Sequence, residues 1–216
     1  MMACKKLVLG VVAIVFAGAS AASGLDSLAS FVKSVTTGRA DFIQTVTAPP
    51  RDGQAARVKT SSGTFEFSRP NRFRFAYRKP FEQTIVADGQ TLWLYDVDLN
   101  QVTARKQAQV LGSTPAALVA AAPDLRALEA EFELQSAPDK DGLQWVQAIP
   151  RAKDGQLQSV RVGFRTGSVA TLAALEIMDN FGQRSVLRFA QVEINPVLAA
   201  STFEFKPPAG ADLIRQ

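Results

Sequence analysis

The side chains that most often perform catalysis are scarce in this sequence. It contains no histidine, and its single cysteine, Cys4, lies near the start. These two residue types supply the imidazole base, the thiolate nucleophile and the ligands of Cys/His metal sites. The chain also lacks the G-x-S-x-G, G-x-x-x-x-G-K-[ST] and G-x-G-x-x-G motifs. We therefore expect no enzyme built on these devices, no bound metal and no cofactor.

Carboxylate pairs are the remaining catalytic candidates. Asp96 and Asp98, and likewise Asp139 and Asp141, are closely spaced and could divide acid and base roles between them. Both pairs lie in sequence typical of turns, where Asp often bonds to its own backbone. A structural role is favoured, but an enzyme that acts on lipid or cell-wall material through such carboxylates stays open as an alternative.

Arg69 is a cation at a position expected to be apolar. Around it, residues 58–106 alternate between the two faces of a strand, with aromatic side chains at odd positions from 65 to 77 and charged ones between them. This alternation predicts antiparallel strands with one buried face and one exposed face. Arg69-Pro70-Asn71 is a turn signal. By parity, Arg69 ends its strand on the aromatic side.

The rest of the chain supplies further strands and two helical regions. Asp88-Gly89 predicts a hairpin, and strand-length runs continue from residue 131 to a final strand expected in STFEFKPPAG. Apolar residues at three- and four-residue spacing predict a helix near 25–37, with Gly38 as its stop, and a second helical region lies near 113–128. This pattern favours a single, mainly β domain with a strongly curved sheet or barrel.

Residues 1–21 have the features of a secretory signal peptide. Lys5 and Lys6 precede an apolar run, and small residues typical of a cleavage site follow. The run is shorter than the roughly 20 residues that span a bilayer, which disfavours the alternative of a membrane anchor. Cleavage would leave residues 22–216 as an exported domain and would lower the formal charge from +4 to +2 by removing two lysines. So mild a charge does not indicate nucleic acid, despite the basic and aromatic residues from Arg72 to Arg78.

Five segments, in order along the chain, resemble the LolA family of periplasmic lipoprotein carriers: SRPNRFRF, QTIVADGQTLWLYDVDLNQVTA, GSTPAALVA, DNFGQ and FEFKPPAGADLI. The resemblance covers essentially all of residues 22–216. It implies an unclosed antiparallel half-barrel of about 10–11 strands, covered by a helical lid near 25–37 and 113–128. It also implies a cavity that receives the acyl chains of triacylated lipoproteins.

The resemblance further implies a periplasmic location and three kinds of partner. These are the cargo lipoproteins, an inner-membrane ABC-type release complex and the outer-membrane receptor LolB. We expect the carrier to be a monomer. A LolB-like receptor is an alternative, but such a receptor needs a lipid-modified cysteine after its apolar run, and residues 17–24 contain none. A periplasmic sensing or structural module on the same sheet also stays open.

Candidate site residues follow from the same resemblance. Arg69, with Pro70, matches the family's R-P motif, whose arginine holds the lid shut by bonding backbone carbonyls, a task suited to five fixed donors. An ordinary ion pair or an exposed turn residue is the alternative. One departure is that Ala116 and Ala117 are small where a lid is expected to be bulkier. For the acyl-chain cavity we expect Phe31, Phe65, Phe67, Phe73, Phe75, Trp93, Tyr95, Leu118 and Val119, with a plain hydrophobic core as the alternative.

Overall fold

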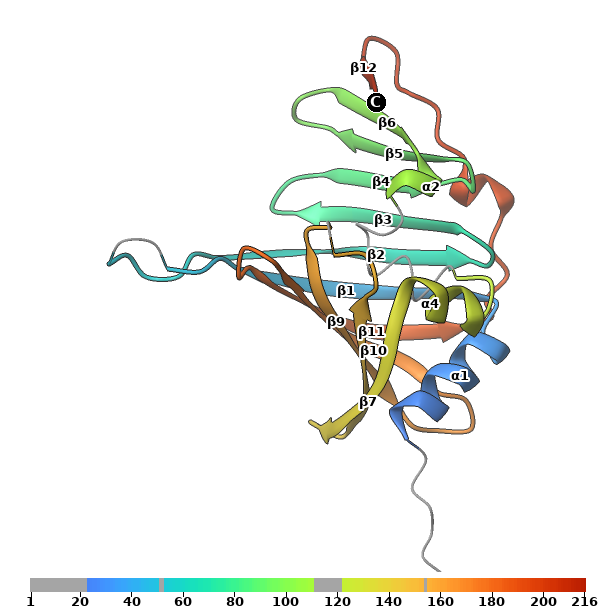
Figure 1. Cartoon of the computed structure of the whole chain (residues 1–216). Helices are drawn as coiled ribbons and strands as arrows, with labels where there is room; N and C mark the ends of the chain where they lie inside the picture. The colour runs from blue at the N-terminus through green and yellow to red at the C-terminus, as the bar shows by residue number, and fades with distance from the viewer. Residues whose placement is uncertain (1–22, 51–52, 111–121, 154) are drawn as a thin grey trace, which may run out of the picture.

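The computed structural model describes residues 23–50, 53–110, 122–153 and 155–216. These residues form one 12-stranded sheet in the order β12-β6-β5-β4-β3-β2-β1-β11-β10-β9-β8-β7. All neighbours are antiparallel except β12 and β6, which are parallel. Because β7 and β12 stand at opposite edges, the sheet is not closed. Figure 1 shows its strong curvature, and the unclosed, mainly antiparallel architecture predicted from the sequence is confirmed.

The strands begin and end close to the predicted turns. Their bounds are β1 Thr37–Thr47, β2 Val58–Ser68, β3 Arg72–Lys79, β4 Gln83–Ala87, β5 Thr91–Asp96, β6 Gln101–Lys106, β7 Phe132–Lys140, β8 Leu143–Pro150, β9 Leu157–Arg165, β10 Thr171–Asp179, β11 Arg184–Ile194 and β12 Asp212–Arg215. The helices are α1 Gly24–Ser34, α2 Gln107–Val110, α4 Leu125–Glu131 and the 3-10 turn η2 Ala200–Phe203. None of the helices in the described ranges is long and apolar enough to cross a membrane.

The last strand lies later in the chain than expected. STFEFKPPAG was predicted to be a strand, but it holds η2 and irregular backbone. Pro207 and Pro208 lack the N–H groups that a ladder needs, which explains the failure. Pairing resumes only at β12, where Leu213 lies opposite Val102 of β6. The strand count therefore exceeds the predicted 10–11.

Helix α1 begins where a capping box fixes it. The side chain of Ser23 accepts a hydrogen bond from Asp26 N, and the Asp26 carboxylate accepts one from Ser23 N at 2.8 Å. Hydrogen bonds from the backbone N–H and the hydroxyl of Ser23 to this carboxylate lower the pKa of Asp26 below its usual value. The helix ends at Ser34, before the expected stop at Gly38. Gly38 instead lies in β1, where a Cβ atom would approach the Phe67 ring to 2.3 Å, so its role is to make room for that ring.

Cross-strand pairing separates the two faces of the sheet. The inner face, defined as the face on which α1 packs, carries the main hydrophobic core, including Phe65, Phe73 and Phe164. Helix α1 contributes Leu28 and Phe31 to this core while it packs on β7, β8 and β9. The opposite, outer face of β3–β6 is covered by the C-terminal segment, which passes η2 to reach β12 in Figure 1.

Candidate functional site

Arg69 joins three parts of the fold at one end of the inner face. Its Nε atom donates to the carbonyl oxygen of Val35 at 2.8 Å, and its Nη1 atom donates to the carbonyl oxygen of Ala122. Val35 is the C-cap of α1, and Ala122 lies just before α4. The backbone N–H of Arg69 also donates to Thr36 O at 2.8 Å. We call the contacts of Arg69 with Val35 and Ala122 the Arg69 bridge.

Aromatic rings surround the same guanidinium. Its Cζ atom lies 5.2 Å from the centroid of Phe31 and 5.5 Å from that of Phe67. Such placement over ring faces attracts a cation. Burial lowers the pKa of Arg69 to about 10, because the charged form loses water. At neutral pH the group is therefore still a cation, held by carbonyl dipoles and rings.

The buried side-chain amide of Gln107 holds the turn that carries Arg69. Asn71 has φ +62°, the left-handed conformation that Asn tolerates, in agreement with the predicted turn, and the Arg69–Pro70 peptide is cis. The side chain of Gln107 donates to Asn71 O at 2.6 Å and accepts from Gly89 N at 3.0 Å. Only 1% of Gln107 is exposed. Sequence reasoning missed Gln107, since nothing in its neighbourhood distinguishes it from other glutamines.

The predicted aromatic face is present and buried. Phe65 lies opposite Phe75 with ring centroids 4.4 Å apart, and Phe67 lies opposite Phe73. Phe31 of α1 reaches this row, with its centroid 6.0 Å from that of Phe67. The parity inferred around the Arg69 turn is therefore confirmed. Three further rings on the inner face, which were not singled out from the sequence, join the cluster: Phe42, Phe164 and Phe189.

Trp93 and Tyr95 do not lie on this face. Phe75 pairs with Ile85, and Ile85 pairs with Leu94, so Leu94 shares the inner face while Trp93 and Tyr95 point outward. Both outward rings pack against Phe205, at centroid distances of 5.6 and 6.0 Å. The expectation that Trp93 and Tyr95 line the cavity was wrong, because the register of the β4–β5 hairpin places both side chains on the outer face. Leu118 and Val119 lie outside the described residues, as do Ala116 and Ala117 and most of the helical region expected near 113–128.

Beside the Arg69 bridge, the described residues leave only a small apolar cavity. The cavity between Phe31, Val35, Phe65 and Phe67 measures about 10 Å³. That is about the volume one water-sized sphere needs, so no acyl chain fits there without movement of its walls. Among the described residues this part of the interior is therefore closed, and the Arg69 bridge lies at its edge.

One member of each carboxylate pair takes part in a turn. Asp96 accepts a hydrogen bond from Leu99 N at 3.1 Å, and Asp141 adopts φ +56° in the turn between β7 and β8. Within the ranges that the structure describes, no group of His, Cys, Asp or Glu side chains could hold a metal ion. Turn chemistry accounts for the geometry of these residues.

Comparisons with known proteins agree on one family. A family model described as "Outer membrane lipoprotein carrier protein LolA" matches residues 33–206. A protein of Albidiferax ferrireducens named outer-membrane lipoprotein carrier protein is 74% identical over 202 residues, covering 93% of this chain and 95% of its own length. One of the same name from Methylibium petroleiphilum is 60% identical over 200 residues, covering 93% of each chain.

A solved structure supports the fold independently. A DUF1329 family protein from Desulfovibrio piger superposes with a TM-score of 0.51 at 12% identity, over 84% of this chain and 95% of its own. At so low an identity the likeness concerns the fold alone.

Proposed function

Since this chain belongs to the LolA family of outer-membrane lipoprotein carrier proteins, we propose that it carries lipoproteins across the periplasm with their acyl chains buried against the inner face of its sheet. The chain is a carrier and not an enzyme. The observation that supports this binding mode is the Arg69 bridge, which lies beside a small apolar cavity of about 10 Å³ among the described residues.

The interior offers the chemistry that acyl chains need. Burying a methylene group contributes about 0.8 kcal/mol, so a single long acyl chain gains on the order of 10 kcal/mol on leaving water. The proposed acyl-binding surface consists of side chains on α1 and on the inner face: Phe31, Phe65, Phe67, Phe73 and Phe75. Because these rings now contact one another, cargo must separate α1 and the Ala122 segment from the sheet.

The Arg69 bridge sets the cost of that separation. Hydrogen bonds to a charged group each contribute about 1.5–3 kcal/mol, so breaking two of them lowers the apparent affinity for cargo substantially. A carrier that binds no nucleotide can pass its cargo only to a receptor that binds the cargo more tightly. A moderate affinity of the carrier for its cargo makes this transfer possible. In our proposal Arg69 and Pro70 therefore favour the closed state when the carrier is empty, and promote release.

The route of transport completes the proposal. Residues 1–21 act as a cleaved signal peptide, and residues 22–216 work as a monomer in the periplasm. Cargo comes from an inner-membrane ABC-type release complex and passes to the receptor LolB. The sequence resemblance given above supports these partners.

The decisive experiment begins with the purified native protein. Mass spectrometry of the protein as isolated is expected to find bound lipoprotein or its lipid. The Arg69→Leu variant should retain more lipoprotein and transfer less of it to LolB-containing membranes than the wild type. Arg188→Leu, a change at an exposed arginine of β11, is the matched control and should behave as wild type. Equal transfer by Arg69→Leu and wild type would refute the role of the bridge, and a native protein free of lipid would refute the carrier function.

A further inference from the structure

A row of hydrogen-bonded polar side chains crosses the inner face next to the aromatic cluster. Tyr77 of β3 donates its O–H to Gln44 Oε1 of β1 at 2.8 Å, and Gln44 Nε2 donates to Ser185 Oγ of β11 at 2.8 Å. We call Tyr77, Gln44 and Ser185 the polar row. Burial raises the pKa of Tyr77 to about 12, so its hydroxyl is a neutral donor under physiological conditions.

The polar row marks one end of the aromatic interior. On each of the three strands the next residue along the same face is apolar: Phe75 on β3, Phe42 on β1 and Leu187 on β11. The ring of Tyr77 contacts that of Phe42 at a centroid distance of 5.0 Å. This contact is possible because Gly63, which lies between them on β2, has no side chain.

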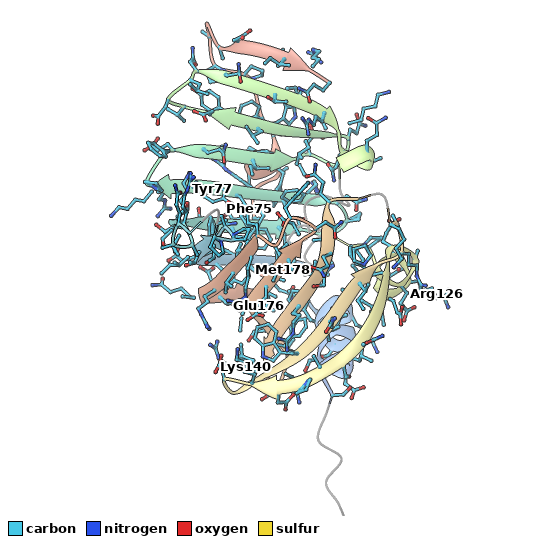
Figure 2. The ribbon with its side chains drawn as sticks, turned by 60° about the vertical axis from the view of Figure 1, so that its left-hand side comes forward. Phe75, Tyr77, Arg126, Lys140, Glu176 and Met178 are labelled. Atoms are coloured by element: carbon cyan, nitrogen blue, oxygen red, sulfur yellow. The ribbon has the colours of Figure 1, made fainter. Side chains whose placement is uncertain are left out.

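The Arg69 bridge and the polar row bound the same apolar strip. Tyr77 is four residues from Phe73, roughly 13 Å along a strand, and Phe73 lies opposite Phe67 beside the guanidinium of Arg69. In Figure 2, Tyr77 and Arg126 of α4 lie on opposite sides of the molecule. An acyl chain that passes the polar row therefore runs towards the Arg69 bridge.

A pocket opens on the other side of the polar row. It has a volume of about 450 Å³, within the usual range for small-molecule sites. Its walls mix apolar groups with charged and amide ones: Gln44, Val46, Lys59, Ser61, Tyr77, Pro80, Phe81, Gln83, Asp96, Asp98 and Leu99. Chemically, this pocket suits the polar part of an amphiphile, whereas the interior beyond the row suits its hydrocarbon.

We propose that the polar row binds the ester and amide groups that join the acyl chains to the N-terminal cysteine of the cargo, while the cargo polypeptide leaves through the pocket. This inference rests on the proposed carrier function. Ester and amide carbonyls are acceptors that lose water on binding and need donors in its place. Tyr77, Gln44 and Ser185 together offer a phenol, an amide and a hydroxyl. In the empty protein these groups bond to one another, so the Tyr77 hydroxyl and the Gln44 amide have partners before cargo arrives.

Two probes separate this role from simple apolar binding. One is a synthetic triacylated lipopeptide, and the other is a hydrocarbon-tailed dye that contains no ester or amide. Tyr77→Phe keeps the ring but removes the donor, and Ser185→Ala removes a second group from the row. Each variant is expected to bind the lipopeptide about 3- to 10-fold more weakly, as the loss of one neutral hydrogen bond predicts, and the dye with wild-type affinity.

Tyr95→Phe is the matched control, since it removes a hydroxyl from the outer face and should change neither affinity. If Tyr77→Phe and Ser185→Ala bound the lipopeptide as tightly as wild type, or lost affinity for both probes equally, the polar row would be a structural tie and the inference would fail. Absence of lipopeptide binding by the wild-type protein would instead overturn the carrier function itself.

Discussion

The Nε atom of Arg69 lies 2.8 Å from the carbonyl oxygen of Val35, the residue that caps the C-terminus of α1. The last carbonyls of a helix have no partners within it, and the helix dipole makes that end attractive to a cation. One side chain therefore both completes α1 and ties it to the sheet. Any change that removes the guanidinium is expected to loosen the helix before it affects the strands.

Hydrogen exchange should reveal this local effect. In Arg69→Leu, amides of residues 24–35 are expected to exchange about 10- to 100-fold faster, because a charge-assisted hydrogen bond of about 1.5–3 kcal/mol is lost at the helix end. Amides of β9 and β10 should keep their protection. Uniformly faster exchange throughout the sheet would show that Arg69 supports global stability instead.

Gln107 offers a test of how the Arg69 turn is held. In Gln107→Glu the carboxylate can still accept from Gly89 N but cannot donate to Asn71 O, so two oxygens face each other. We expect the free energy of unfolding to fall by about 1–3 kcal/mol, measured by urea denaturation. The exposed Gln156→Glu serves as the control and should leave it unchanged.

Truncation of one ring tests how much the aromatic cluster contributes to the free energy of unfolding. Phe65→Ala removes a ring that is 1% exposed and contacts three other rings, so it should lower the free energy of unfolding by about 3–5 kcal/mol. Phe181→Ala removes a ring of the same type that is 71% exposed and should have little effect. Similar losses in the two variants would contradict the assignment of the core.

Tryptophan fluorescence tests the register of β5. Trp93 and Trp145 both lie on the outer face, so binding of a triacylated lipopeptide is expected to leave their emission nearly unchanged. Leu94 faces inward, and Leu94→Trp, in a chain whose own two tryptophans are replaced by Phe, should show a blue shift on binding. A response from Trp93 alone would reverse the assignment of the faces.

The ionisation of Tyr77 can be followed directly. Tyr77 and Tyr95 are the two tyrosines of the sequence, so in Tyr95→Phe the ultraviolet absorbance of phenolate reports Tyr77. Its midpoint should lie near pH 12 because burial disfavours the anion. The unfolded chain ionises near pH 10, so this group's contribution to folding stability falls as the pH rises from about 10 to 12. A midpoint near 10 would show an exposed hydroxyl.

The sequence alone determined the features that depend on near neighbours. Alternation grouped Phe65 with Phe67, and Phe73 with Phe75, on single strand faces, because successive side chains of a strand point to opposite sides. The same local logic located α1 and most of the strands. The R-P turn stood out for the same reason, as a cation beside an aromatic run.

Tertiary structure decided what depends on register and on distant pairing. Trp93 and Tyr95 face outward because of the β4–β5 register, which a one-residue shift would reverse. Phe205 covers them, and β12 pairs with β6, although more than 100 residues separate the two strands in the sequence. Gln107 and the polar row acquire their partners only when strands remote in the sequence lie side by side. Local patterns fix which side chains share a strand face, whereas the hydrogen-bond partners of a buried polar group are set by the packing of the whole sheet.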